Sequence, residues 1–217
     1  MGVVIGEVMP LALAIALSPF PVVPAILLLF TPRPRATGAA FLAGWAAGIA
    51  VAAGVAAVLA SVVELYEGTP TWAAWTKTAL GLLLVVLGAR QWRARGGKET
   101  PAWVRSLADT TPARALRLGL LLSAANPKVL LLAAAGGLTI GSADLTPAGS
   151  AAALAVLTAV AAATVALPLL LHTLVGDRVL GPLGRAKDWL ETHNAAVTAL
   201  VLAVVGAVLT AEGLAAL

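Results

Sequence analysis

The stretch "LLLSAANPKVLLLAAAGG", residues 120–137, places a lysine directly after a proline inside an apolar run. Lys128 follows Arg117 by eleven residues, or about 16 Å along a helix, which is roughly half of a ~30 Å hydrocarbon core. A cation at that depth costs a few kcal/mol or more. Pro127 removes a backbone donor and frees carbonyl groups near Ser123, which are tolerated there only against protein or a water-lined cavity. These residues predict a polar helix break.

Two interpretations of this break are open. In the first, Asn126 and the freed carbonyl groups solvate Lys128, which is then a structural feature only. In the second, the ammonium is unpaired and binds an anionic or strongly polar group of a ligand. Every carboxylate of the sequence lies near a predicted helix end or in a loop, so none is placed to neutralise Lys128. This distribution favours the second interpretation.

A second interruption lies in "IALSPFPVVPAILLLF", residues 15–30, where three prolines occur within six residues. One proline kinks a membrane helix, and we expect three so close together to unwind it. Two such breaks, one in each half of the chain, point to a shared polar site. The predicted substrate-binding residues are Ser18, Pro19, Pro21, Pro24, Ser123, Asn126, Pro127 and Lys128.

The composition is that of a membrane protein. Of the 217 residues, 60% are hydrophobic and 11% are charged, and the mean hydropathy is +0.98. Apolar runs of about 20 residues are typical of membrane helices, whereas the alternating pattern of a membrane barrel is absent. The sequence has no cysteine, which excludes disulfides, thiolate metal sites and thiol redox chemistry. We predict an all-α integral membrane protein whose six spans are residues 3–30, 36–63, 72–92, 112–139, 147–174 and 194–215.

The distribution of charge predicts the orientation of the spans. Basic residues gather in the loops after the first, third and fifth spans, while the other connections and the termini carry acidic residues. By the positive-inside rule, the basic loops face the cytoplasm and both termini lie on the extracytoplasmic side of the cytoplasmic membrane. The basic residues of these loops are Arg33 and Arg35, then Arg90, Arg93, Arg95, Lys98, Arg105, Arg114 and Arg117, then Arg178, Arg185 and Lys187.

Three spans in each half insert in opposite senses, as in an inverted-repeat transporter with broken helices near the bilayer midplane. Aligning the two broken segments places Ser18 opposite Ser123. We therefore divide the one membrane domain into a first repeat, residues 1–92, a basic cytoplasmic loop, residues 93–111, and a second repeat, residues 112–217. The first and fourth spans are the broken ones.

Three segments carry a resemblance to a known family: "ALSPFPVVPAILLLFTPRPRATGAAFLAGW", "LGLLLSAANPKVLLLAAAG" and "DWLETHNAAVTAL". They resemble the glycolipid-addressing, or sulfolipid-addressing, family, a branch of the LysE-type superfamily, over nearly the whole chain. The resemblance implies a six-span inverted repeat that moves glycolipids toward the outer envelope of mycolate-type bacteria. The positions that match are Ser18, Pro19, Pro21, Arg33, Arg35, Asn126, Pro127, Lys128, His193 and Asn194.

We expect a membrane transporter for an amphipathic, anionic lipid or glycolipid, with Arg33, Arg35, His193 and Asn194 gathering headgroups. Two alternatives are open: an exporter of a small solute such as an amino acid, and a scaffold that docks a larger lipid transporter without transporting anything itself. An enzyme is not expected, because no nucleophile–base pair or metal-ligand set is evident. We expect no cofactor, no metal and no nucleic acid; the expected partners are membrane lipids, a larger lipid transporter and a second copy of the chain.

Overall fold

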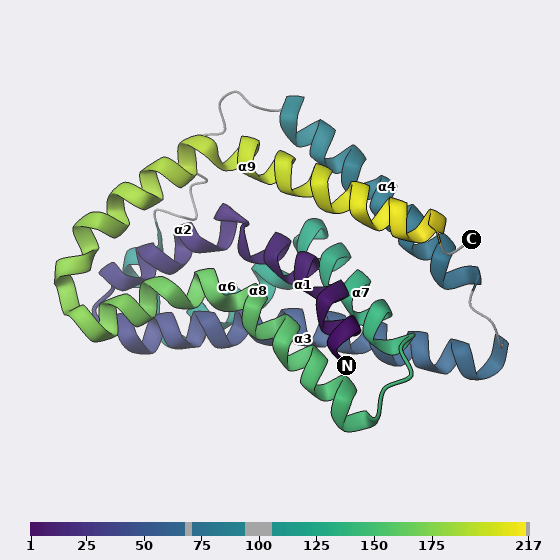
Figure 1. Cartoon of the computed structure of the whole chain (residues 1–217). Coiled ribbons are helices and arrows are strands. Elements are labelled where there is room, and N and C mark those ends of the chain that lie inside the picture. The colour runs from purple at the N-terminus through teal and green to yellow at the C-terminus, as the bar shows by residue number, and fades with distance from the viewer. Residues whose placement is uncertain (68–70, 94–105, 216–217) are drawn as a thin grey trace.

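The computed structural model describes residues 1–67, 71–93 and 106–215, and every regular element in these ranges is helical. Figure 1 shows the arrangement, and the prediction of an all-α fold is confirmed. The elements are α1 (Gly2–Ala16), α2 (Pro19–Leu27), η1 (Leu28–Phe30), α3 (Pro34–Glu67), α4 (Thr71–Arg93), η2 (Ser106–Asp109), α6 (Pro112–Ala124), α7 (Pro127–Gly141), α8 (Pro147–Val175), η3 (Gly176–Val179) and α9 (Leu180–Ala215).

Proline and a hydrogen-bonding cap define where several helices begin. Proline suits the first helical position because its missing N–H would have no helical partner there. Thr111 precedes Pro112 and accepts a hydrogen bond from the backbone of Arg114, and Thr146 precedes Pro147 and accepts one from Gly149. Both threonines are therefore the N-caps that their sequence context predicts.

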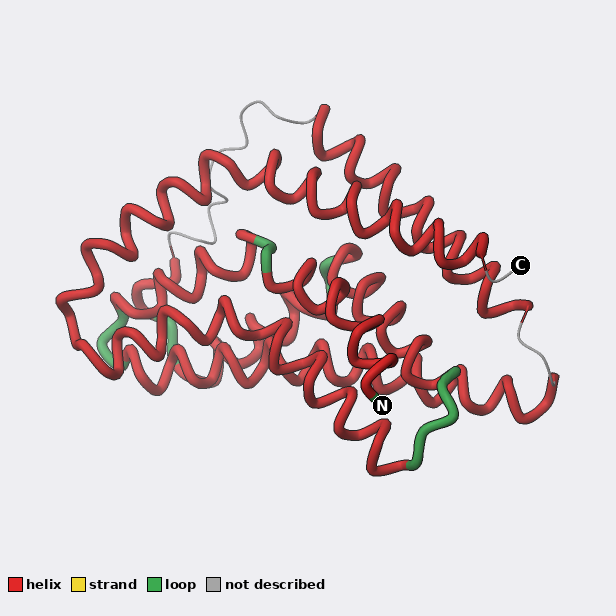
Figure 2. The backbone as a smooth tube through the Cα atoms, in the orientation of Figure 1, coloured by secondary structure: helices red, strands yellow, loops and turns green. Residues whose placement is uncertain are grey.

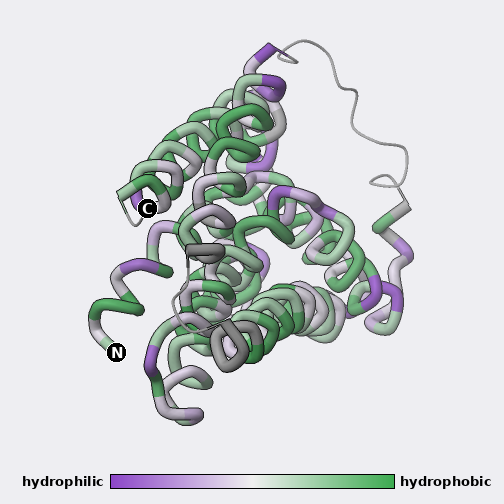
Figure 3. Tube along the Cα trace, turned by 90° about the vertical axis from the view of Figure 1, so that its right-hand side faces the viewer, coloured by the Kyte–Doolittle hydropathy of each residue, from purple (hydrophilic) through white to green (hydrophobic). Residues whose placement is uncertain are grey.

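The apolar helices are those of a membrane protein, and hydrophobic residues run along most of them (Figure 3). Three segments are long and apolar enough to cross a bilayer: Pro34–Val62, Pro147–Leu190 and Ala195–Ala215. Two bent pairs raise this number to five when each pair is taken as one span, namely Gly2–Ala16 with Pro19–Phe30 and Pro112–Ala124 with Pro127–Gly141. The number six remains a prediction.

The third and the last predicted spans differ most from the structure. α4 covers residues 72–92 but is not among the apolar candidates; it contains Lys77 and ends in Arg90 and Arg93, which lower its hydropathy. α9 begins at Leu180 rather than at residue 194, so the segment before the last span is helical and continuous with it. In Figure 1, α4 and α9 lie side by side, as their contacts require.

Close helix approaches at small residues hold the bundle together. A Cβ atom on Gly44 of α3 would collide with the carbonyl oxygen of Leu116 in α6, and one on Gly119 would collide with that of Phe41. A Cβ on Gly48 would likewise meet the Ser123 hydroxyl. α3 therefore packs backbone to backbone on α6, in the manner of small-residue interfaces between membrane helices.

The two halves of the chain follow one order of elements and interlock. Each half consists of a broken pair, then a long helix, then a further helix. α3 packs on α6, and α8 packs on α1, which is the same pairing with the halves exchanged. α3 also contacts α8, and α4 contacts α9, so equivalent helices meet each other as well. This pattern is what an inverted repeat would produce, and the two-fold axis itself stays a prediction.

Candidate functional site

The first break is a two-residue interruption between α1 and α2. α1 ends at Ala16, and Ser18 is the N-cap of α2, whose axis is bent by 53° from the first helix of the pair. The side chain of Thr164 in α8 donates a hydrogen bond of 2.6 Å to the carbonyl oxygen of Ala16. A carbonyl group at the broken helix end is thus satisfied by a neighbouring helix, as a membrane interior requires.

The three prolines do not unwind the chain, contrary to expectation. Pro19 occupies the start of α2, where its missing donor is harmless, and Pro24 lies inside a helix that continues to Leu27. Pro19, Pro21 and Pro24 are all buried. Their role in the structure is therefore to begin and shape α2, while the break is confined to the two residues before it.

The second break has the same construction. α6 ends at Ala124, Asn126 is the N-cap of α7, and the two helices are bent by 71°. The Asn126 side-chain oxygen accepts a hydrogen bond of 3.1 Å from the backbone N–H of Lys128, so Asn126 caps the helix rather than solvating the ammonium. Figure 2 shows both breaks as short loop segments between the helices.

The caps change the alignment of the two halves. Ser18 precedes Pro19 at the start of α2 as Asn126 precedes Pro127 at the start of α7. Ser18 is thus equivalent to Asn126, and its predicted pairing with Ser123 is wrong. Ser123 lies in the last turn of α6, where its buried hydroxyl lies 3.0 Å from the carbonyl oxygen of Gly119 and 2.9 Å from that of Leu120.

The two breaks meet through the side chain of Lys128. Its Nζ atom donates a hydrogen bond of 2.7 Å to the Ser18 hydroxyl oxygen. Both side chains belong to buried residues, with 7% of Lys128 and 1% of Ser18 exposed. Within the described ranges, no carboxylate forms an ion pair with Lys128. An ammonium group has three donors, so Ser18 leaves capacity for further acceptors, which the oxygens of an anionic group could supply.

The predicted headgroup residues on the basic side are exposed at the corner between η1 and α3. Arg33 precedes α3 and Arg35 lies in its first turn. Two threonines that the sequence did not single out stabilise this corner: Thr31 donates to the Leu28 carbonyl at 2.7 Å, and Thr37 donates to the Arg33 carbonyl at 2.8 Å.

Arg33 also borders a small cavity of about 330 Å³. Its other walls are Pro32 and the turn that begins α6, including Asp109 and Thr110. Because Asp109 places a carboxylate beside Arg33, this cavity is less suited to an anion than the arginine alone would be.

The hydrogen bond and the ring contact of His193 both lie within α9. His193 is exposed on α9, its Nδ1 atom lies 2.9 Å from the Trp189 carbonyl oxygen, and its ring stacks on that tryptophan with a centroid distance of 4.6 Å. The backbone of Asn194 lies in α9, and its side chain is outside the described part of the chain. The structure therefore joins Ser18 to Lys128, whereas the interactions of His193 are with Trp189.

Comparison with protein families gives a clear result. The model of the family described as Sap, sulfolipid-1-addressing protein, matches residues 8–215. The chain belongs to this family. The match spans both breaks and nearly the whole membrane body, so the predicted family is confirmed, while membership of the wider LysE-type superfamily stays a prediction. Neither the curated proteins nor the solved structures give a significant match.

Proposed function

We propose that this protein moves an amphipathic, anionic lipid or glycolipid across the cytoplasmic membrane toward the cell envelope. The observation that carries the proposal is the buried Lys128 ammonium, which joins the two helix breaks through Ser18 and has no carboxylate partner within the described residues. Burying a cation in a membrane protein without an acidic partner costs free energy, so a cation in such a place indicates a functional site. The sulfate of a sulfolipid, a phosphate or a carboxylate would each supply the missing acceptors.

The family supports the class of cargo. Its name refers to the addressing of a sulfolipid, which is an anionic lipid with a polar head and long apolar chains. In this proposal the breaks hold the polar head, while the apolar chains stay in contact with hydrocarbon. The basic loops face the cytoplasm and both termini lie outside. The chain acts without a chemical reaction on its cargo and without a cofactor.

The deciding experiment measures transfer of a fluorescent or isotopically labelled anionic lipid in proteoliposomes. We expect Lys128→Met to lower the rate by at least tenfold, which corresponds to losing about 1.4 kcal/mol of interaction in the rate-limiting state. Lys128→Arg should keep part of the rate, because it keeps the charge. Lys187→Met removes a lysine that pairs with Asp188 at 2.8 Å, far along the chain from either break, and should leave the rate unchanged.

The same assay separates the alternatives. A small-solute exporter would move a labelled amino acid and show the Lys128 dependence there, with no lipid transfer. A scaffold for a larger lipid transporter, or for a second copy of this chain, would show no transfer of either cargo. In that case Lys128→Met would support normal envelope assembly in cells, and charge reversal at Arg114 and Arg117 would disrupt complex formation. Normal lipid transfer by Lys128→Met would contradict the proposed site.

A further inference from the structure

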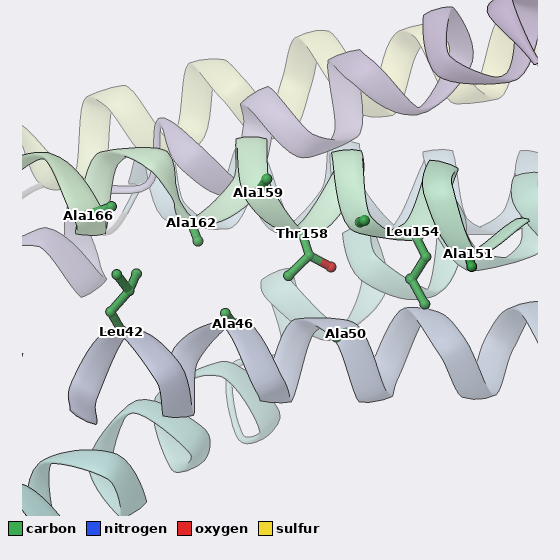
Figure 4. A pocket seen from close by; sticks show the side chains of 10 residues that line it. Leu42, Ala46, Ala50, Ala151, Leu154, Thr158, Ala159, Ala162 and Ala166 are labelled. Carbon is green, nitrogen blue, oxygen red and sulfur yellow. The ribbon is translucent and has the colours of Figure 1, made fainter. Parts of the chain in front are cut away.

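The described part of the chain contains an apolar groove between α3 and α8, and none of the residues that line it belongs to the two breaks. Its volume is about 550 Å³, within the range of small-molecule sites. All but one of the residues that line it are alanine or leucine, and the exception is Thr158. Figure 4 shows Ala46 of α3 and Ala162 of α8 facing each other across it.

Glycines of α3 face leucines of α8 on either side of Ala46 and Ala50. A Cβ atom on Gly38 would lie 2.9 Å from the Leu169 side chain, which is a tight approach, and a Cβ atom on Gly54 would lie at an ordinary contact distance of 3.7 Å from that of Leu154. Between these contacts the facing residues are mostly alanines, whose side chains are too short to fill the space. Protein interiors are otherwise close-packed, so the gap is a specific feature of this helix pair.

The surroundings restrict what can fill the groove. Both helices are among the segments apolar enough to cross a membrane, so the groove opens where hydrocarbon replaces water. Its lining offers almost no polar atoms, and Thr158 is the single polar residue. The hydroxyl oxygen of Thr158 is buried and has no hydrogen-bond partner among the described residues, whether or not the groove is filled. An apolar chain matches the remaining lining, which has no polar side chain.

Arg35 adds a charge to one end of the same helix face. Arg35, Leu42 and Ala46 are separated by seven and four residues, which places them on one side of α3. Arg35 is exposed, whereas Leu42 and Ala46 line the groove. The distance from Arg35 to Ala46 along the helix is about 16 Å, close to half of a ~30 Å hydrocarbon core and thus to the depth of one lipid leaflet.

We propose that the groove between α3 and α8 binds an acyl chain of an anionic membrane lipid whose headgroup lies at Arg35. The inference rests on the proposed function, because it assigns a place to the apolar part of the same class of lipid. The charge of Arg35 complements the headgroup, and the alanine-lined groove accepts the chain below it. The site differs from the breaks, which bind the polar head during transfer.

The test uses photoactivatable lipids with a diazirine on the acyl chain, in phosphatidylcholine vesicles that contain the purified protein. Phosphatidylglycerol carries the diazirine in one series and phosphatidylcholine in the other, and mass spectrometry locates the labelled peptides. With phosphatidylglycerol we expect the facing segments of α3 and α8 to be labelled more heavily than the exposed face of α4 at Leu82 and Val86. Equal labelling of all these surfaces would overturn the proposal, because it would describe ordinary annular lipid.

Two matched variants occupy the groove or leave it free. Ala46→Phe fills it and should lower labelling there about tenfold, the effect of losing contact with roughly two methylene groups. Ala47→Phe places the same ring on a neighbouring exposed position outside the lining and should change nothing. If Ala46→Phe folds poorly, Ala50→Phe makes the same comparison. Undiminished labelling in a folded groove-filling variant would overturn the proposal.

Two further variants separate the headgroup from the chain and this proposal from the proposed function. Arg35→Gln should reduce groove labelling by phosphatidylglycerol several-fold and leave that by phosphatidylcholine unchanged; an equal effect on both lipids would refute the role of Arg35. Lys128→Met should lower the rate of lipid transfer by at least tenfold while groove labelling persists. If transfer depends on Lys128 but the groove is never preferred, this inference fails and the proposed function stands.

Discussion

The contact between Lys128 and Ser18 joins residues 110 positions apart in the sequence. A buried ammonium that loses its hydrogen-bond acceptor carries the desolvation cost without compensation, whereas removing both partners restores an apolar contact. The two side chains are therefore coupled energetically, independently of any ligand. Their coupling can be measured in the empty protein.

At this scale we predict a strongly non-additive mutant cycle. Ser18→Ala should lower the free energy of unfolding by about 1–3 kcal/mol, because it leaves Lys128 without its partner. In the Lys128→Met background the same substitution should be nearly neutral. Thermal melting of the purified protein in detergent, followed by circular dichroism, gives the four midpoints.

Ser61→Ala is the matched control, because Ser61 is an exposed serine that bonds only to the carbonyl of Val58 in its own helix. It should leave the melting midpoint nearly unchanged in either background. Additive effects of Ser18→Ala and Lys128→Met would show that the hydrogen bond between them contributes nothing to stability.

α3 and α6 approach each other closely at glycine residues, which have no side chain. Gly119 of α6 and Gly44 of α3 let the two backbones approach so closely that an added Cβ would collide with main-chain oxygen atoms. Backbone atoms cannot move aside as a side chain can, so a larger residue must separate the helices. Because α6 leads directly into the second break, a displaced α6 would also move Asn126 and Lys128.

For this interface we predict that Gly119→Val lowers stability by about 1–3 kcal/mol, the usual cost of overpacking, and also reduces lipid transfer. The melting midpoint and the proteoliposome rate measure the two effects. Gly181→Val is the control for the change of residue type, since a Cβ on Gly181 would meet no atom within 4 Å. A stable and active Gly119→Val variant would contradict the close packing of α3 on α6.

Sequence alone was sufficient for some of these elements and not for others. Lys128 and the prolines stand out by residue type in an apolar run, and proline with a capping residue marks where helices begin. Two contacts could not be predicted, namely that of Ser18 with Lys128 and that of Thr164 with the Ala16 carbonyl. In each, the two residues lie far apart in the sequence, and serine and threonine are too common in membrane helices for one of them to be selected as the partner. The pairing of Ser18 with Ser123 was wrong because matching identical residues ignores where each helix starts.

The two halves of the molecule contact each other through several helix pairs and form one membrane domain. The orientation of one helix in the membrane therefore determines the orientation of all of them. The loop between α7 and α8, which contains Asp144, and η3, which contains Arg178, lie at opposite ends of α8. α8 has 29 residues, or about 43 Å, enough to separate these two positions by a full bilayer. They should therefore lie on opposite sides of the membrane.

Because the chain has no cysteine, single cysteines report this orientation without further mutation. We predict that an impermeant thiol reagent labels Asp144→Cys in intact cells and labels Arg178→Cys only after the membrane is opened. The reason is the excess of arginine and lysine in the loops on the side of Arg178. Labelling of Arg178→Cys alone in intact cells would reverse the assigned topology.

The two breaks share a cap and a proline, but the next position differs: Phe20 follows Pro19, whereas Lys128 follows Pro127. Of these two equivalent positions, only that in the second break carries a charge. If the halves arose by duplication, the ancestral site would have held either two like charges in close repulsion or none. Divergence at this one position would then have made the two breaks chemically different. An anionic group between them would meet an ammonium from the second half and a phenyl ring from the first.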